Sequence, residues 1–389
     1  MARAGVLSLS VVLAGALVLC GPEPSLGSAA RPPAPNLSRI HWKGAEARAP
    51  LEDGGEAVLT LDFDLQRSAE SLLARAWPIA GAVVAIDVAS GKLRVFASFT
   101  REDYRGPPPL FSADAPAASI FKLVTTATLL ERTPVTLNQR VCSSGGHRGI
   151  ERRHLQPPND AHQHCAPFFS ALGFSRNAAY AQLVTRHLAR DDLVETAEHL
   201  GFNARLPFEL GVDLGRLDVP FGDLEFARTA VGFENSWLNP VGAAHLALSI
   251  ATRGYYNQIH VVEKTDTWTA PPKRRELRRA LRQVTANRLI QMMEVTVYSG
   301  TARPAFTDAD GHGYFGNLRV AGKTGTLKPA PEAPATSWFT GFAPSRSPEI
   351  VVAVLLRNAR VWRREAKEVA RDVLRAYFSA RGRPGVTAP

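Results

Sequence analysis

The chain has 389 residues, of which 45% are hydrophobic and 21% are charged. This balance is typical of a globular protein and excludes a largely disordered chain. The formal net charge of +10 favours an anionic partner, such as a membrane surface or an acidic polymer. No zinc-finger, helix-turn-helix or RNA-recognition pattern is present, so we expect no nucleic-acid partner.

The first 30 residues predict an export segment. Arg3 precedes an apolar run over residues 4–20, and small residues follow at 27–30, as in a secretory signal with its cleavage site. The run is also just long enough for an uncleaved membrane anchor, and Cys20 offers lipidation as a third fate. Each alternative places the rest of the chain outside the cytoplasm, in the periplasm or cell envelope, and we expect N-terminal anchoring in the cytoplasmic membrane.

The remaining chain divides by composition into three parts. Residues 31–56 are rich in Pro, Ala and Arg and predict a linker without a core of its own. Residues 57–380 have the periodic apolar patterns of a folded domain. We expect residues 381–389 to form a disordered tail.

Predicted elements follow in chain order from Ala57. In the sequence VLTLDFDLQRSAESLLARA, apolar and polar residues first alternate and then follow the spacing of an amphipathic helix. This pattern predicts a short strand leading into a helix. In GAVVAIDVASGKLRVFASF two β-branched runs flank residues 89–92, which predicts a hairpin. Residues 117–131 predict a buried helix, and residues 133–167 predict a long loop.

Helices are expected to dominate up to about Gly254. The sequence NLRVAGKTGTL then predicts a strand, residues 338–357 predict two more, and residues 361–378 predict a final amphipathic helix. Strands at both ends of a helical middle indicate an α/β (α+β) fold, with a sheet completed by both chain ends.

Cys142 and Cys165 are the only cysteines after the export segment. In an oxidising compartment such a pair forms a disulfide by default. A metal site is the main alternative, because His162 and His164 lie beside Cys165 and zinc binds mixed Cys and His ligands. Free thiols are a third alternative. The spacing matches no standard zinc motif, so we expect no metal.

Two polar side chains interrupt the apolar segment APAASIFKL. Ser119 and Lys122 are three residues apart and therefore share one face of a helix. Serine needs an adjacent base to act as a nucleophile, and burial lowers the pKa of a lysine so that its neutral amine can serve. Taken alone, S-x-x-K is a weak pattern that fits an ordinary helix surface.

Two later segments carry further candidates. Ser175 reads most simply as the N-cap of the following helix, an interpretation that leaves Asn177 unexplained. Gly322 and Gly325 lie inside a predicted strand, which indicates either a bulge or a close approach to the backbone.

Together the three segments show the order S-x-x-K, S-x-N and K-T-G, which resembles the signature of penicillin-binding proteins and serine β-lactamases. The likeness extends through VGFENSWLNPVGAAHLALSIATRGY, MMEVTVYSGTA and SWFTGFAPSRSPEIVVAVLL, and covers residues 57–378. It implies a penicillin-binding transpeptidase domain with a central antiparallel sheet, flanking helices and a helical subdomain. The active site would lie between the sheet and the subdomain.

The resemblance also implies roles for the catalytic side chains. Ser119 would attack the penultimate D-Ala of a peptidoglycan stem peptide, and Lys122 would take its proton. Ser175 would relay a proton to the leaving amine. Asn177 would hold the substrate amide and Lys122.

The resemblance assigns substrate binding to the K-T-G strand. Lys323 and Thr324 would bind the terminal carboxylate, with Thr326 nearby, while Gly325 would leave the strand bare for an extended peptide. Backbone N–H groups of Ser119 and Thr326 would form the oxyanion hole. No cofactor is expected.

The sequence departs from the family at Ala117-Ala118, which replace the usual Pro-Gly before the nucleophile. We also expect no upstream glycosyltransferase domain. The expected function is a D,D-transpeptidase that binds β-lactams at the membrane surface, beside a glycan polymerase as a candidate partner. The alternatives are a D,D-carboxypeptidase, a β-lactam sensor or scaffold, and a β-lactamase using Glu234 as an additional base.

Overall fold

A five-stranded antiparallel sheet forms the centre of the computed structural model, with strand order β14-β15-β16-β4-β5. The structure describes residues 34–159, 163–328, 334–359 and 361–389. The five strands are β4 (Ala80–Asp87), β5 (Leu93–Thr100), β14 (Ala321–Leu327), β15 (Ala335–Ala343) and β16 (Ile350–Asn358). The expected hairpin is present as β4 and β5, and β16 pairs with β4, so both chain ends complete the sheet as predicted.

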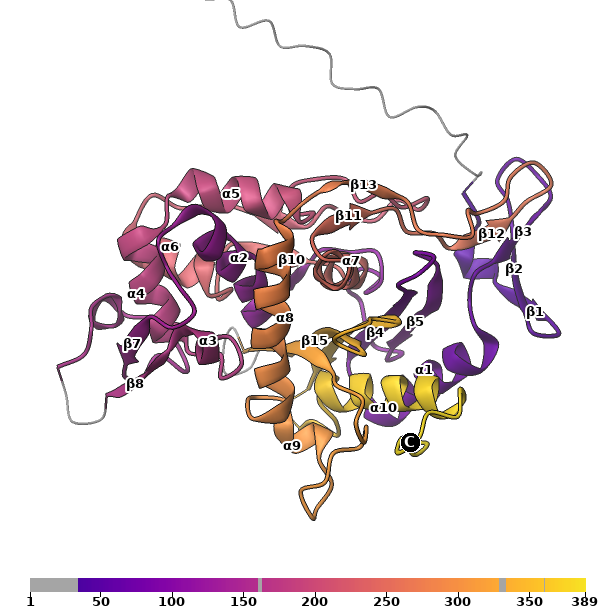
Figure 1. Cartoon of the computed structure of the whole chain (residues 1–389). Helices are drawn as coiled ribbons and strands as arrows, with labels where there is room; N and C mark the ends of the chain where they lie inside the picture. The colour runs from indigo at the N-terminus through magenta and orange to yellow at the C-terminus, as the bar shows by residue number, and fades with distance from the viewer. Residues whose placement is uncertain (1–33, 160–162, 329–333, 360) are drawn as a thin grey trace, which may run out of the picture. The chain divides into compact units, whose positions relative to one another are not determined.

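Strand alternation divides the core into two layers. Val84 and Ile86 face the larger apolar cluster, whereas Val83 and Ala85 face the smaller one. Helices α1 (Phe63–Ala76) and α10 (Ala366–Ser379) pack on the side of the smaller cluster, and α7 (Pro240–Ala251) packs on the opposite face (Figure 1). The sheet is therefore buried on both faces.

A helical region lies beside β14, as the sequence predicts. Its helix α8 (Gln283–Tyr298) packs directly against β14. Helix α2 packs against α8 (Figure 1). The helices of this region and its borders are η2 (Ala118–Phe121), α2 (Lys122–Arg132), η3 (Arg152–Leu155), α3 (Phe168–Ala171), α4 (Asn177–His187), α5 (Arg190–His199), α6 (Asp223–Ala230) and α9 (Arg303–Phe306). The short strands are β6 (Ala115–Pro116), β7 (Arg140–Ser143), β8 (His164–Pro167), β9 (Arg216–Leu217), β10 (Ser236–Leu238), β11 (Tyr255–Asn257) and β13 (Glu276–Arg279).

The linker prediction is wrong for the described residues from position 35 onward. After the short helix η1 (Leu37–Arg39), a four-stranded sheet follows in the order β1-β2-β3-β12, with β1 (His41–Lys43), β2 (Glu46–Pro50), β3 (Glu56–Leu59) and β12 (Val262–Lys264). Ala47 and Ala49 on β2 are fully buried. Because alanine is small, two alternating alanines are enough to form an apolar strand face that composition alone does not reveal.

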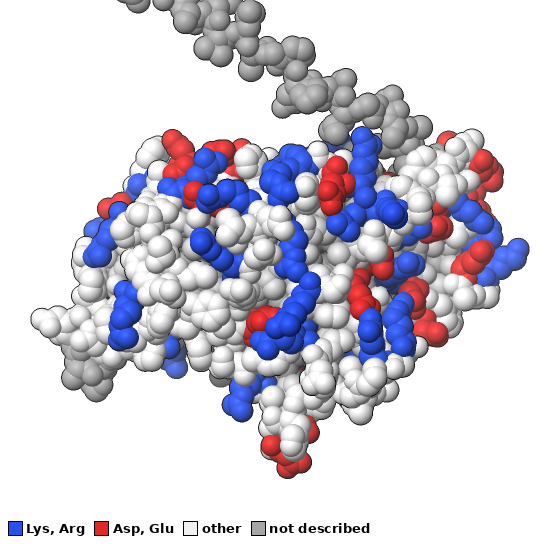
Figure 2. Space-filling view, viewed as in Figure 1, with Lys and Arg blue, Asp and Glu red and all other residues white. Residues whose placement is uncertain are grey.

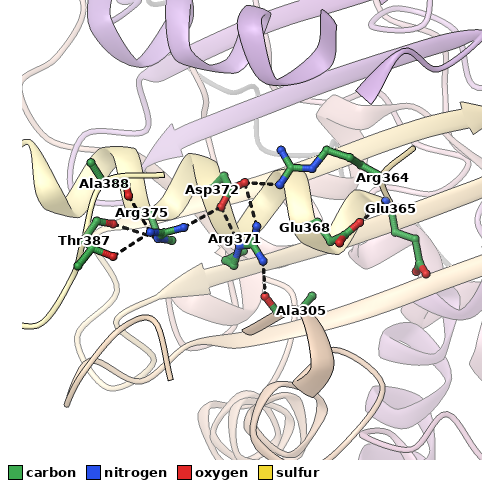
Figure 3. A network of polar contacts seen from close by, with 9 residues as sticks. All are labelled: Ala305, Arg364, Glu365, Glu368, Arg371, Asp372, Arg375, Thr387 and Ala388. Carbon is green, nitrogen blue, oxygen red and sulfur yellow. Dashed lines mark hydrogen bonds and ion pairs between the residues drawn. The ribbon is translucent and has the colours of Figure 1, made fainter. Parts of the chain in front are cut away.

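The tail prediction is also wrong, since the last residues pack on α10. Arg375 donates hydrogen bonds to the carbonyl and hydroxyl oxygens of Thr387 and to the carbonyl of Ala388 (Figure 3). Val386 joins the smaller apolar cluster. These contacts order residues whose Gly-Pro composition predicts a disordered end.

A buried carboxylate organises α10 itself. Asp372 is 3% exposed and accepts hydrogen bonds from Arg364, Arg371 and Arg375 (Figure 3). Burial alone would raise the pKa of Asp372, but the hydrogen bonds and charges of Arg371 and Arg364 hold that pKa below its usual value. The network fixes the start of α10, which borders the cavity described below.

The export segment lies outside the described residues. Within the part of the chain that the structure describes, no helix combines the length and the apolar character needed to cross a bilayer.

Candidate active site

Ser119 and Lys122 are brought together as the sequence predicts. Ser119 lies in η2 and Lys122 begins α2, and their Oγ and Nζ atoms are 2.7 Å apart. Lys122 is 0% exposed, and its amine also donates to the carbonyl oxygen of Val231 at 2.8 Å. The aromatic rings of Tyr180 and Phe233 also lie near this amine, each centred 5.9 Å from Nζ.

This environment disfavours a charged Lys122. Burial lowers the pKa of Lys122 well below its usual value, and the positive charge of Lys323 lowers it further. A neutral amine has a lone pair with which it can accept the Ser119 proton. The pair therefore has the geometry of a nucleophile beside its base, and the lowered pKa of Lys122 favours the neutral amine that a base requires.

The residue before Ser119 has an uncommon backbone conformation. Ala118 has φ = 48°, in the left-handed region where L-residues other than Gly, Asn and Asp are rare. Gly232 lies very close to this residue, because a methyl group on Gly232 would overlap the Ala118 carbonyl. The departure from Pro-Gly at positions 117–118 thus leaves an alanine in a conformation that glycine adopts without strain.

Ser175 and Asn177 line the same cavity as Ser119. Ser175 has φ = 52° and accepts a hydrogen bond from Lys323 Nζ at 3.2 Å. It is not the N-cap, because α4 begins at Asn177 and the N-cap position is held by Arg176 without a side-chain hydrogen bond. The structural interpretation of Ser175 from sequence is therefore wrong, and its hydroxyl is oriented by the lysine of β14.

Asn177 has a different partner from the one expected. Its Nδ2 donates to the carbonyl of Gly146 at 2.8 Å, and its buried Oδ1 has no hydrogen-bond partner among the described residues. Lys122 Nζ is bonded to Ser119 and Val231 instead. The described residues therefore show no hydrogen bond between Asn177 and Lys122.

Lys323 is buried behind the cavity wall on β14. It is 0% exposed, and its Nζ donates to Ser175 Oγ and to the Thr324 carbonyl. Burial lowers the pKa of Lys323 to about 7. Near neutral pH this amine is therefore easily converted between its charged and neutral forms.

Gly325 has a packing role that differs from the expected one. A Cβ at this position would lie 3.3 Å from the Ala118 Cβ and 3.2 Å from the Trp338 Cβ. Trp338 in turn donates from Nε1 to the Pro116 carbonyl at 2.9 Å. Glycine at 325 therefore makes room for the segment that carries Ser119.

One cavity of about 220 Å³ is lined by five of the eight candidate residues, whereas Lys122, Lys323 and Gly325 are not part of its lining. Five of the residues that line it were predicted from sequence: Ser119, Ser175, Asn177, Thr324 and Thr326. Six were missed: His147, Phe174, Phe233, Thr301, Glu365 and Lys367. Thr301 lies within the quoted family segment MMEVTVYSGTA, but Glu365 and Lys367 begin a helix and carry no motif that could have identified them.

Cys142 and Cys165 form a disulfide between β7 and β8, where they are directly paired. This confirms the predicted disulfide and excludes the metal interpretation for these two residues, since both thiols are consumed. His164 is exposed, and His162 lies outside the described residues. This β7–β8 hairpin is held against α4, because Gln182 donates a hydrogen bond to the Cys142 carbonyl at 3.0 Å.

Glu234 does not contribute to the cavity wall. Its carboxylate lies 3.6 Å from Arg228 and its side chain is 45% exposed. This position offers no support for Glu234 as the additional base of a β-lactamase.

Comparisons with known proteins agree with the fold and the motif order. The family model described as the penicillin binding protein transpeptidase domain matches residues 81–378. Stage V sporulation protein D of Bacillus subtilis is 25% identical over 344 residues, which cover 81% of this chain and 52% of that protein. The peptidoglycan D,D-transpeptidase PbpA of Mycobacterium tuberculosis is 24% identical, with 78% of this chain and 68% of that protein covered. The chain thus spans about half the length of the first relative and about two thirds of the second.

Solved structures show the same fold. The crystal structure of PBPA from Mycobacterium tuberculosis has a TM-score of 0.68 at 22% identity, covering 85% of this chain and 82% of that one. The D,D-transpeptidase domain of a peptidoglycan glycosyltransferase from Eggerthella lenta has a TM-score of 0.70 at 24% identity, covering 85% and 84%.

Proposed function

Because the chain belongs to the penicillin-binding protein transpeptidase family, we propose that it is a peptidoglycan D,D-transpeptidase that works through an acyl-enzyme on Ser119. The observation that carries this proposal is the 2.7 Å contact between Ser119 Oγ and the buried amine of Lys122. Two relatives are named for cell-wall chemistry, the D,D-transpeptidases PbpA and MrdA. The substrate is accordingly a stem peptide ending in D-Ala-D-Ala.

The contact between Ser119 and Lys122 supports the following acylation step. Ser119 Oγ attacks the carbonyl carbon of the penultimate D-Ala while its proton passes to Lys122 Nζ. Backbone N–H groups of Ser119 and Thr326 stabilise the oxyanion, and a missing donor in such a site typically costs 10²–10³ in rate. The C–N bond then breaks, and the terminal D-Ala leaves with the proton that Lys122 took from Ser119, relayed through the Ser175 hydroxyl.

Substrate binding is assigned to β14 and α4. Lys323 and Thr324 hold the terminal carboxylate of the donor peptide with Thr326 beside them, and Asn177 holds the substrate amide. The Asn177 side chain is buried at 6% exposure and is already oriented by Gly146. A fixed amide loses little conformational entropy when it binds the peptide.

The second step completes the cross-link. An amine of an acceptor stem peptide attacks the ester carbonyl and gives up a proton to Lys122 Nζ, a new amide bond forms, and Ser119 Oγ leaves and takes that proton from Lys122. If water attacks in place of the amine, the same residues give a D,D-carboxypeptidase. A chain that is acylated and then stops would be a β-lactam sensor.

A fluorescent penicillin tests the nucleophile. Wild-type protein becomes labelled, Ser119→Ala is not labelled, and Ser347→Ala, at an exposed serine, is labelled like wild type. Labelling that persists in Ser119→Ala would contradict the proposal. Rapid loss of label from wild type would instead favour a β-lactamase.

Turnover of a disaccharide-pentapeptide distinguishes the two peptidase activities. With an added acceptor amine, a transpeptidase gives the cross-linked product, whereas a carboxypeptidase gives the shortened peptide whether or not the amine is present. Cross-linked product would support the main proposal.

We further propose that the protein works at the outer face of the cytoplasmic membrane, near a glycan polymerase. The net charge of +10 suits an anionic lipid surface, and the first 30 residues have the composition of a signal or anchor. An anchored protein stays with membranes through a high-salt wash. A protein recovered in the soluble fraction with its N-terminus after Ala30 would contradict anchoring.

A further inference from the structure

Two charged residues of the cavity have no part in the chemistry described so far. Glu365 and Lys367 lie at the start of α10 and line the same cavity as Ser119. Glu365 is labelled at the start of this helix in Figure 3. The side chain of Lys367 is 19% exposed and that of Glu365 is 38% exposed, so both are half-buried and neither points freely into solvent.

Hydrogen bonds connect Lys367 to the K-T-G strand. Lys367 Nζ donates to the Thr301 carbonyl at 3.5 Å, and the Thr301 hydroxyl lies 2.5 Å from the Thr324 hydroxyl. Thr324 is the residue proposed to bind the donor carboxylate. A single residue, Thr301, therefore connects the Lys367 amine to the Thr324 hydroxyl.

Glu365 forms an ion pair with the Lys367 amine and still leaves N–H groups of that amine available. The distance from Nζ to the Glu365 carboxylate is 3.0 Å, and Glu365 is itself held as the N-cap of α10 in a reciprocal capping box with Glu368. An ammonium group has three N–H donors. The described contacts of Lys367 are one ion pair, with Glu365, and one hydrogen bond, to the Thr301 carbonyl.

Lys323 by itself gives only weak electrostatic attraction to an anion bound at Thr324. It is fully buried, and its described hydrogen bonds are made to Ser175 and to the Thr324 carbonyl. Burial also lowers the pKa of Lys323 to about 7, so part of the population is neutral near that pH. A second cation that is partly exposed to water, and therefore stays charged, strengthens the binding of a carboxylate at this position.

We propose that Lys367 is a substrate-binding residue that, together with Thr301 and Thr324, holds the free terminal carboxylate of the donor peptide. The inference rests on the proposed acyl-transfer function and extends it by one recognition element. It makes the cavity selective for peptides that end in a charged carboxylate over those that end in a carboxamide.

A pair of thioester substrates provides the test. Both carry an N-acylated D-alanyl group, and the thiol leaving group bears a carboxylate in one and a carboxamide in the other. Ser119 Oγ forms the ester bond while the C–S bond breaks, so the release of thiol measures acylation. The quantity compared is the ratio of the two acylation rates within one protein, which does not depend on the folded fraction.

Lys367→Met is expected to lower the acylation rate with the carboxylate thioester about tenfold, since a charged hydrogen bond to a partly buried group has this magnitude. The rate with the carboxamide thioester changes less than about twofold. Lys367→Arg keeps most of the carboxylate preference, and Lys43→Met, at an exposed position of β1, keeps all of it.

Three results would overturn the inference. One is an unchanged carboxylate preference in Lys367→Met. Another is an equal loss with both thioesters, which indicates a structural role. The third is unchanged acylation with an altered partition between aminolysis and hydrolysis, which places Lys367 at the acceptor peptide. Failure of wild type to be acylated by either thioester would overturn the proposed function itself, so the two failures are distinguishable.

Discussion

Gly232 lies directly against the carbonyl group of Ala118, the residue that precedes the nucleophile. Gly232 has φ = 83° and is followed by Phe233, which lines the cavity. Because the obstacle is backbone and cannot rotate away, any side chain at 232 must displace the turn that carries Ser119. The absence of a side chain at this glycine therefore helps to position Ser119 Oγ against Lys122.

The first prediction concerns Gly232→Ala. We expect the rate of acylation by penicillin to fall by at least about 10²-fold, since a shift near 1 Å at a catalytic group has effects of this size. The melting temperature is also expected to fall. Gly211→Ala is the matched control, because a Cβ there meets no atom within 4 Å and the backbone is not left-handed. Equal acylation rates in the two variants would contradict the prediction.

The second prediction concerns Ala118→Gly. Alanine at φ = 48° carries about 1–2 kcal/mol of strain, and glycine removes it at an entropic cost of about 0.4–1 kcal/mol in the unfolded chain. We therefore expect an unchanged or slightly higher melting temperature, measured by circular dichroism. Ala117→Gly, at a fully buried residue with right-handed backbone (φ = −64°), should lower it. If both variants are destabilised alike, the backbone strain at 118 has no energetic consequence.

The third prediction is a pH dependence of stability. The pKa of Lys323 falls from 10.5 to about 7 on burial, so between these values the unfolded chain binds the proton and the folded protein does not. The free energy of unfolding therefore rises with pH over this window, by at most about 1.4 kcal/mol per pH unit. Urea unfolding at pH 7, 8 and 9 should show a smaller rise in Lys323→Met than in wild type. Parallel pH profiles would show that Lys323 remains charged in the folded protein.

The fourth prediction concerns the disulfide. Cys142 and Cys165 are 23 residues apart, and a loop of this length corresponds to about 3 kcal/mol of stabilisation in the chain-entropy model. Reduction should lower the melting temperature of wild type and leave the double variant Cys142→Ser/Cys165→Ser unaffected. Acylation should slow in both reduced and double-variant protein, because the hairpin presents Gly146 to Asn177. An unchanged acylation rate would separate the hairpin from the active site.

Much of the fold could be predicted because its elements carry strong local patterns. The β4–β5 hairpin has two β-branched runs around a turn at Gly91, which has φ = 74°. The family motifs placed Ser119, Ser175 and Thr324 around one cavity, as the structure confirms. Patterns of this kind depend on neighbours in sequence, which a single chain displays.

What the sequence did not predict depends on neighbours in space. The left-handed turn at Ala118 becomes intelligible only beside Gly232 and Gly325, which are distant in sequence. The direction of the Asn177 amide depends on where Gly146 lies. Lys367 resembles any exposed helical lysine until α10 is placed against β15, where the Ala366 N–H donates to the hydroxyl of Ser337.

The pairing of β16 with β4 has a consequence for a chain that is synthesised from its N-terminus. Ser119 and its neighbours are synthesised early. Strand β16, which pairs with β15 and thereby supports β14, is synthesised near the end. Contacts so distant in sequence form late in folding. We therefore expect a partly synthesised chain to lack the assembled cavity, and the proposed reaction of Ser119 to begin only after β16 and α10 have formed.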